Sequence, residues 1–279
     1  MQGFVWVLSL LSACVEVRDA PEDGDWYQKA FLDVEEPVEF TDLPYDFSGP
    51  TPIANLPIPA LGSFATWLDT SLFNDNCDGW QRSDELPRDI EGIVTLHPRF
   101  YFKTSGCRGS SEADSDEKYY GSYFIQDDSG GVFVLGDSKV AHFDMGQRVK
   151  LRVRGVKENF DLQMVSAHDV IEVSTAVEPI YYQWADGPLG PDDVSEVRRV
   201  TGTVLGDTTN FGELTVEADD GSLYTVKLDW EITRRKHRWD EGASVTVTGP
   251  VLLAYDVYAI NVMRVGQILT HETTSSTTP

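Results

Sequence analysis

The sequence has few of the residues that catalytic and metal sites most often use. Its 279 residues include three cysteines and five histidines. It contains no His-Glu-x-x-His pair, no Gly-x-Ser-x-Gly elbow, no glycine-rich phosphate loop and no set of zinc ligands at a suitable spacing. His168-Asp169 could supply a base, but the sequence places no nucleophile beside it. These absences favour a non-catalytic protein without a resident cofactor.

Positive charge is also scarce. The chain has 22 Lys and Arg against 46 Asp and Glu, which gives a formal net charge of −24 and a pI near 4.4. A charge of this size keeps a protein soluble and repels polyanions at long range. Because affinity for nucleic acid depends on cationic contacts to phosphate, nucleic acid is not the expected main partner.

The N-terminus carries a short apolar run, residues 4–11, followed by Ser12, Ala13 and Cys14. The run is shorter than the roughly 20 residues that a membrane-spanning helix needs. Small residues after an apolar run are typical of a secretory signal peptide. Residues 1–13 contain no Lys or Arg, whereas signal peptides usually begin with positive charge. A buried N-terminal strand is an alternative.

The four residues Leu11-Ser12-Ala13-Cys14 resemble the lipobox of bacterial lipoproteins. The resemblance implies that residues 1–13 are a signal peptide cleaved before Cys14. It also implies diacylglycerol on Cys14 and acylation of the new terminus, as with palmitate. Val15 stands where Asp would signal retention at the inner membrane, so the family rule implies the outer membrane. The alternative is an ordinary secretory signal.

Two cysteines remain, Cys77 and Cys107. An exported protein resides where disulfides persist, so a leftover pair favours one bridge. Closing this interval would stabilise the fold by roughly 3–4 kcal/mol on the loop-entropy estimate. Two unpaired buried thiols are the alternative.

Residues 14–60 form an acidic, proline-rich stretch. Between residues 15 and 60 there are eleven Asp and Glu but only Arg18 and Lys29 among the basic residues. This composition predicts an extended and mostly disordered tether with an r.m.s. span of about 40 Å. Its few aromatic residues could let part of it dock. A connecting segment, residues 61–87, follows, and residues 271–279 are expected to form a disordered tail.

Two copies of one β-unit follow the tether, at residues 88–175 and 196–270, with a linker at 176–195. Val149, Leu151 and Val153 alternate with basic residues, as in a strand with one buried face. Turns rich in Asp and Gly, at residues 127–131 and 219–221, indicate hairpins. Five short strands per copy predict an all-β protein with two tandem five-stranded OB-like barrels.

The run from Tyr123 to Val134, the segment 145–149 and Arg154-Gly155 resemble OB-fold domains of secreted bacterial proteins. Such domains often accompany extracellular nucleases or stand alone in lipoproteins. The resemblance covers residues 88–174 well and residues 196–268 more weakly. It implies a fold, and a fold alone does not assign an activity.

A degenerate calcium loop precedes the first copy. Asn74, Asn76 and Asp78 stand at alternate positions, Gly79 follows, and Glu85 falls at the twelfth position. This is the spacing of an EF-hand loop, in which alternate oxygens face one ion and the last Glu is bidentate. A solvated acidic loop without metal is the more favoured interpretation.

Basic and aromatic side chains form the candidate binding residues. A basic groove with aromatic rings is what single-stranded nucleic acid requires, whereas pairing with the protein's own carboxylates is the alternative. The candidates are Tyr119, Tyr120 and Tyr123, the row Arg148, Lys150, Arg152 and Arg154, and the cluster Trp230, Arg234, Arg235, Lys236, Arg238 and Trp239. The tyrosines could form a stacking platform or could simply pack in the core.

Together these features predict a lipid-anchored, non-catalytic binding or assembly module of the cell envelope whose ligand the sequence does not name. An envelope protein or glycan is the expected partner, besides the membrane that holds the anchor. One alternative is a lipoprotein that binds single-stranded nucleic acid. Another is an envelope protein stabilised by Ca²⁺.

Overall fold

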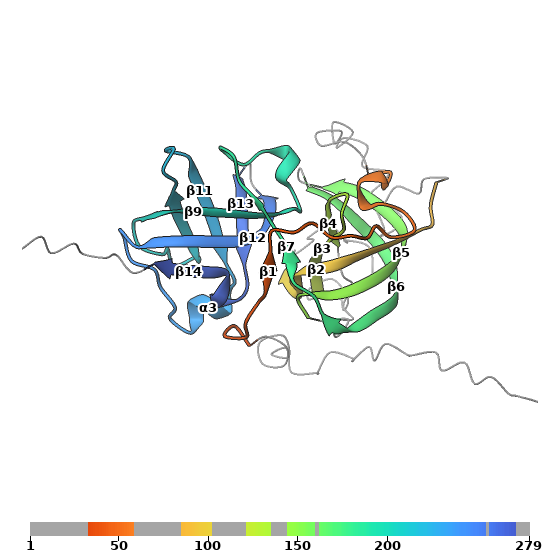
Figure 1. Cartoon of the computed structure of the whole chain (residues 1–279), viewed down its shortest axis with the longest axis horizontal. Coiled ribbons are helices and arrows are strands. Elements are labelled where there is room, and N and C mark those ends of the chain that lie inside the picture. Colours follow the sequence, from red (N-terminus) through yellow and green to blue (C-terminus); the bar gives the residue numbers. More distant parts are fainter. Residues whose placement is uncertain are drawn as a thin grey trace, which may run out of the picture.

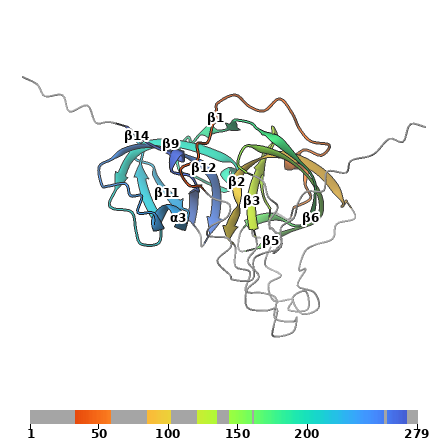
Figure 2. The same cartoon turned by 90° about the horizontal axis from the view of Figure 1, so that it is seen from below.

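The computed structural model describes residues 33–58, 85–101, 121–134, 144–159, 162–254 and 257–271. These residues form two β-barrels that lie side by side (Figures 1 and 2). No helix within these ranges is long and apolar enough to cross a membrane. The structure is nearly all β.

The first barrel is a closed ring of five strands in the order β2-β3-β4-β6-β5. Neighbouring strands are antiparallel except β4 and β6, which run parallel with Phe133 opposite Met164. The strands are β2 (Arg88–Tyr101), β3 (Gly121–Gln126), β4 (Gly131–Val134), β5 (Gln147–Asn159) and β6 (Leu162–Val177).

The second barrel repeats this topology. Strands β11 and β13 are parallel, and β12 closes the ring by pairing with both β13 and β9. Its strands are β9 (Val197–Leu205), β10 (Glu213–Glu217), β11 (Leu223–Leu228), β12 (Ser244–Ala254) and β13 (Val257–Val262). Helix α3 (Trp230–Arg234) lies between β11 and β12, and η4 (Val265–Gln267) and β14 (Ile268–His271) follow β13. The prediction of two tandem five-stranded OB-type barrels is confirmed.

Strand periodicity and turn chemistry explain why these segments form barrels. Val149, Leu151 and Val153 are fully buried, whereas the alternating Arg152 and Arg154 are exposed. The predicted hairpin joins β3 to β4, and Asp127 Oδ1 accepts hydrogen bonds from the backbone N–H groups of Ser129 at 2.8 Å and Gly130 at 3.1 Å. An Asp that satisfies its own turn in this way favours a tight reversal.

Barrel 1 presents an apolar row on its outer surface. Leu96, Phe124, Phe133 and Met164 lie opposite one another across β2, β3, β4 and β6. Their sequence neighbours on β3 and β4 fill the inside of the barrel, so this row faces outward. All four residues are buried in one cluster with Val251 and Leu252 of β12. The second barrel therefore covers the outer face of β3 and β4.

Residues 180–195 join the barrels as ordered structure. They contain β7 (Ile180–Tyr181), β8 (Gln183–Trp184) and η3 (Pro191–Asp193). Strand β8 extends the second sheet by pairing in parallel with β9, and Arg199 of β9 lies 3.6 Å from the ring centroid of Tyr182. The connection thus packs against the second barrel.

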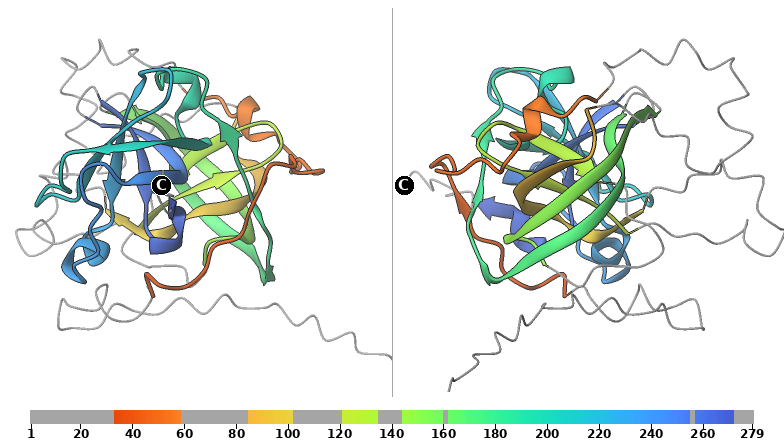
Figure 3. Two further views of the ribbon diagram at one scale, coloured as in Figure 1. Left: turned by 60° about the vertical axis from the view of Figure 1, so that its left-hand side comes forward. Right: turned by 90° about the vertical axis from the view of Figure 1, so that its right-hand side faces the viewer.

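Residues 33–58, named here the strap, cross both barrels. β1 (Phe40–Thr41) pairs in parallel with β7, and η1 (Ile53–Asn55) lies on the first barrel (Figures 1 and 3). Val34 is buried in the core cluster of the second barrel, while Ile53 and Leu56 are buried in that of the first. The expectation of a mostly disordered tether is therefore wrong for this part, because isolated apolar side chains among the acids find buried sites.

Candidate partner-binding sites

Helix α3 positions the basic run 234–238. The helix begins at an N-cap, Asp229, whose side chain accepts a hydrogen bond from Glu231 N at 2.8 Å. It ends at Arg234 with Arg235 as its C-cap, and Lys236 has a positive φ of 65°. Because the helix has five residues, the whole basic run lies around its C-terminal end.

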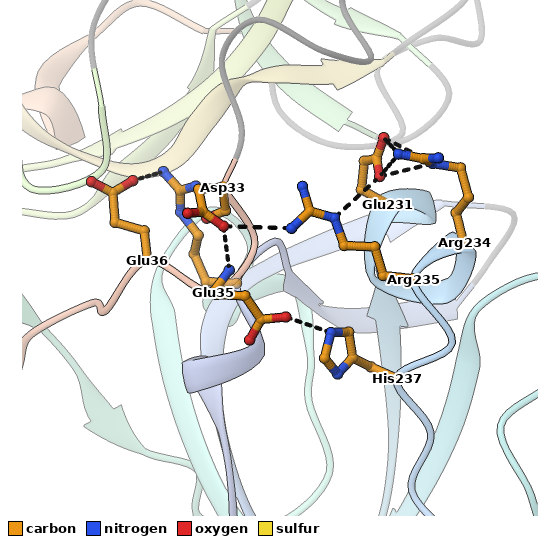
Figure 4. Close-up of polar contacts among 8 residues, drawn as sticks. Asp33, Glu35, Glu36, Glu231, Arg234, Arg235 and His237 are labelled. Carbon is orange, nitrogen blue, oxygen red and sulfur yellow. Dashed lines mark hydrogen bonds and ion pairs between the residues drawn. The ribbon is translucent and has the colours of Figure 1, made fainter.

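Glu231 holds two of these cations. Its carboxylate is fully buried and accepts hydrogen bonds from Arg234 at 2.8–3.0 Å, while Arg235 Nε lies 3.7 Å away (Figure 4). A buried carboxylate needs such partners, since an unpaired charge in the interior is costly. Glu231 therefore fixes both guanidinium groups.

The acidic end of the strap meets the same cations. Asp33 Oδ1 lies 3.5 Å from Arg235, and Glu35 Oε1 lies 2.6 Å from His237 Nε2, an ion pair when His237 is protonated (Figure 4). Between these acids, Val34 is buried, and its carbonyl accepts a hydrogen bond from Val265 N at 2.7 Å. The strap thus places one apolar residue in the barrel and carboxylates on the cations around it.

Arg264 connects the strap to both barrels. Its side chain is 1% exposed, and its Nη2 lies 2.9 Å from Glu36 Oε2 and 2.6 Å from Asp144 Oδ1. Its Nη1 donates to the carbonyl of Asp33. Asp144 precedes β5 of the first barrel, and His97 Nε2 lies 3.8 Å from the same Oδ1. One buried guanidinium therefore joins three separate parts of the chain.

The outer face of β10 and β11 is a second candidate. In OB folds the face of the second and third strands and the adjacent loops contact ligands. Leu223 is 58% exposed on β11 and, by the parallel register of β11 and β13, lies beside the exposed Val257. Phe211, in the loop before β10, is 84% exposed. Glu217 is exposed on the same strand pair, and Lys227 of β11 is ion-paired with Glu213 of β10, so this face combines apolar and charged groups.

The predicted basic row of β5 pairs with the protein's own carboxylates. Arg148 contacts Glu178 at 2.9 Å and Glu91 at 3.3 Å, and the hydrogen bond to Glu178 raises its pKa. Arg152 bonds Asp89 at 2.8 Å, which lowers the pKa of that carboxyl.

The other two members of the row have acidic neighbours as well. Arg154 Nη2 lies 2.5 Å from Asp169, and Lys150 lies in register between Glu91 and Glu172. The basic row therefore pairs with the protein's own carboxylates, which was the alternative to ligand binding in the sequence analysis.

The predicted aromatic platform is absent from the residues described. Tyr123 is buried in the first core, its hydroxyl lies 3.0 Å from His168 Nε2, and burial raises its pKa. Trp239 is buried in the second core. A stacking role for these two rings is therefore wrong. Tyr119 and Tyr120 lie outside the described residues, as does the side chain of Trp230.

Most of the other predicted sites fall outside the described ranges. These are Cys14, Cys77, Cys107, Asn74, Asn76 and Asp78. Glu85 is described, and its carboxylate accepts a hydrogen bond from Arg88 at 2.9 Å. Among the residues that the structure covers, no group of three or more His, Cys, Asp or Glu could hold a metal ion.

Sequence reasoning missed Arg264, Asp144 and the acidic residues of the strap. One signal was present: Arg264 is the only charged residue in the largely apolar segment 257–270. A charged residue in such a run is buried only with partners. The identity of those partners could not be predicted, since Asp33 and Asp144 lie 231 and 120 positions from Arg264.

Strand order defines this chain as a tandem OB-fold protein. No family model matches it, and no curated protein matches it. Among solved structures it is similar to the tetrameric p202 HIN2, at 12% identity and a TM-score of 0.27, over 69% of this chain and 99% of that one. It is also similar to a replication protein A heterotrimer bound to ssDNA, at 13% identity and a TM-score of 0.30, over 69% of this chain. The chain spans about half of that second match, 51%. Such low scores carry no inference about ligands.

Proposed function

We propose that this chain is a non-catalytic binding and assembly module of the cell envelope, held at the outer membrane by lipid on Cys14. The motif Leu11-Ser12-Ala13-Cys14 supports the anchor. Labelling cells with radioactive palmitate tests it. The wild-type chain should take up label and the Cys14→Ser variant should not, and equal labelling would contradict the anchor.

The observation that supports a protein partner is the difference between the two barrels. The outer β3–β4 face of the first barrel is buried against the second barrel. The equivalent β10–β11 face of the second barrel is exposed and carries Leu223, with Phe211 in the loop before it. Exposed apolar side chains grouped on one surface mark protein interaction sites, whereas acidic side chains disfavour polyanions. An envelope protein is the partner that fits this face.

Affinity capture from detergent-solubilised envelope of the native organism tests this proposal. The full chain should retain one protein in stoichiometric amount, and Leu223→Asp should abolish that retention. Leu43→Asp is the matched control, because Leu43 is 71% exposed but lies on the strap. If wild type and Leu223→Asp retain the same proteins, or if neither retains any, the proposal fails.

Single-stranded nucleic acid is the weaker proposal. The β10–β11 face carries Glu213 and Glu217 against the single cation Lys227, which is paired with Glu213, and the basic row of β5 is ion-paired. We expect no binding of a labelled oligothymidylate in 20–50 mM salt, where cationic contacts are strongest. Steeply salt-dependent binding that is lost when Arg234, Arg235 and Arg238 are replaced by Ala would reverse this ranking.

Calcium stays a separate proposal, because three of its four predicted ligands lie outside the described residues. A bound ion stabilises the folded state by mass action. If the site exists, the melting temperature rises with Ca²⁺ and falls with a chelator. An unchanged melting temperature would dismiss it.

A further inference from the structure

We propose that the second barrel carries a peptide-binding site for a short acidic sequence with a central valine, and that residues 33–36 of the strap occupy it in cis. This strap site comprises Arg235, His237, Arg264 and the position that Val34 fills. The inference does not depend on the β10–β11 face or on the lipid anchor.

The contacts of the strap are those of a bound peptide. Asp33 and Glu35 meet Arg235 and His237 (Figure 4), and Glu36 meets Arg264. Val34 lies between them in the apolar core of the barrel. Main-chain recognition accompanies the side chains, because the carbonyls of Asp33 and Val34 both accept hydrogen bonds from barrel 2. These contacts select a peptide in which an acidic residue is followed by Val and two further acidic residues.

The site is organised by residues other than the strap. Asp144 Oδ1 holds Arg264 at 2.6 Å, and Gln267 Oε1 accepts hydrogen bonds from the backbone N–H groups of Met263 at 2.8 Å and Arg264 at 2.9 Å. Glu231 separately holds Arg235. Arg264 and Arg235 therefore keep charged partners when the strap leaves, and an acidic peptide from another molecule finds the same two guanidinium groups.

The carboxylates of the strap are only partly buried. The side chains of Asp33, Glu35 and Glu36 are 66%, 52% and 49% exposed, and an ion pair whose partners are both well exposed, such as Asp33 with Arg235, contributes little. Occupancy in cis therefore depends on the high local concentration that covalent connection gives. A partner with the same acid-Val-acid-acid chemistry displaces the strap once its own concentration at the site is comparable.

A fluorescent peptide with the sequence of residues 31–38 tests the proposal on the full chain. In the test variant, Asp33, Val34, Glu35 and Glu36 are all replaced by Ser, which empties the site. The peptide should bind this variant with one-to-one stoichiometry and at least tenfold more tightly than it binds wild type. Adding Arg235→Ala to the variant should weaken binding at least tenfold, and so should Val34→Asp in the peptide.

Equal binding to wild type and variant, or none to a variant that melts cooperatively, would overturn the proposal. A second measurement uses the wild-type chain and so does not depend on the variant's folding. Excess peptide should speed amide hydrogen exchange in residues 33–38 of the chain, because these residues are displaced. Unchanged exchange at a peptide concentration tenfold above the dissociation constant that wild type itself shows would overturn the proposal as well.

Discussion

At the scale of single residues, the buried charges Glu231 and Arg264 decide how distant parts of the chain meet. Both side chains are nearly or fully inaccessible, and both contact charges from other segments or from the next turn. Removing one partner of such a set leaves a charge uncompensated, which costs more than the pair itself contributes. These two residues should therefore be less tolerant of change than the more exposed cations beside them.

Arg264→Ala should lower the free energy of unfolding by about 1–3 kcal/mol, because the carbonyl of Asp33 and the carboxylate of Asp144 lose their hydrogen-bond donor. Urea denaturation followed by tryptophan fluorescence measures this change. Arg238→Ala is the control, since Arg238 is exposed and donates to the backbone carbonyls of Thr233 and His237. It should change stability by roughly 0.5 kcal/mol or less. A loss of that small size for Arg264→Ala would contradict the role given to it.

Glu196 predicts a pH dependence of stability. Burial raises its pKa, Arg198 lowers it in part, and Asp193 and Asp192 raise it further. When the pKa of a carboxyl is higher in the folded state than in the unfolded state, the folded state binds the proton more tightly. The free energy of unfolding therefore increases as pH falls through the folded-state pKa. Glu196→Gln mimics the neutral form, so its melting temperature should exceed that of wild type at pH 8. This advantage should shrink as pH falls to 5, and a constant difference across that range would contradict the prediction.

At the scale of elements, the internal repeat is explained in part by backbone geometry. Gly146 and Gly242 occupy equivalent positions before β5 and β12, with φ of +83° and +84°. Side chains other than Gly are strained in this left-handed region. Both copies need a residue with positive φ at this point, so both have glycine there. The sequence alone therefore reveals this part of the repeat.

Alanine substitution should destabilise the protein by different amounts at the two glycines. At Gly242 no described atom lies within 4 Å of an added Cβ, so Gly242→Ala should cost about 1–2 kcal/mol from backbone strain alone. At Gly146 the Cβ would lie 2.6 Å from Val177 Cγ1 and 2.7 Å from Glu178 O. Gly146→Ala should therefore cost clearly more. Chemical denaturation of both variants checks the order, and equal losses would contradict the packing described.

The strap is a segment for which amino-acid composition gives the wrong prediction. Its acids and prolines predict disorder, but its docking depends on single apolar residues and on local hydrogen bonds. Ile53 N, for example, donates to Asp127 Oδ2 at 2.9 Å, on the hairpin of the first barrel. A pairing across 74 positions leaves no trace in local composition, so this part of the fold could not be derived from the sequence.

At the scale of the whole molecule, the sequence predicts each barrel but not their contact. Alternation of apolar and polar residues identifies the strands of both barrels, because one face of a strand is buried. Strands β3 and β4 depart from alternation, with consecutive apolar residues at Tyr123–Ile125 and Val132–Val134. Such runs indicate strands buried on both faces, and barrel 2 is what covers the second face.

The central claim is that the strap, Arg264 and the outer row containing Phe133 join the two barrels into one cooperative body. Calorimetry of the full chain tests it most directly, because a two-state unit has equal calorimetric and van't Hoff enthalpies. The account predicts a single endotherm with a ratio of these enthalpies close to one. Two resolved endotherms, or a ratio near two, would show that the barrels unfold independently and would contradict the account.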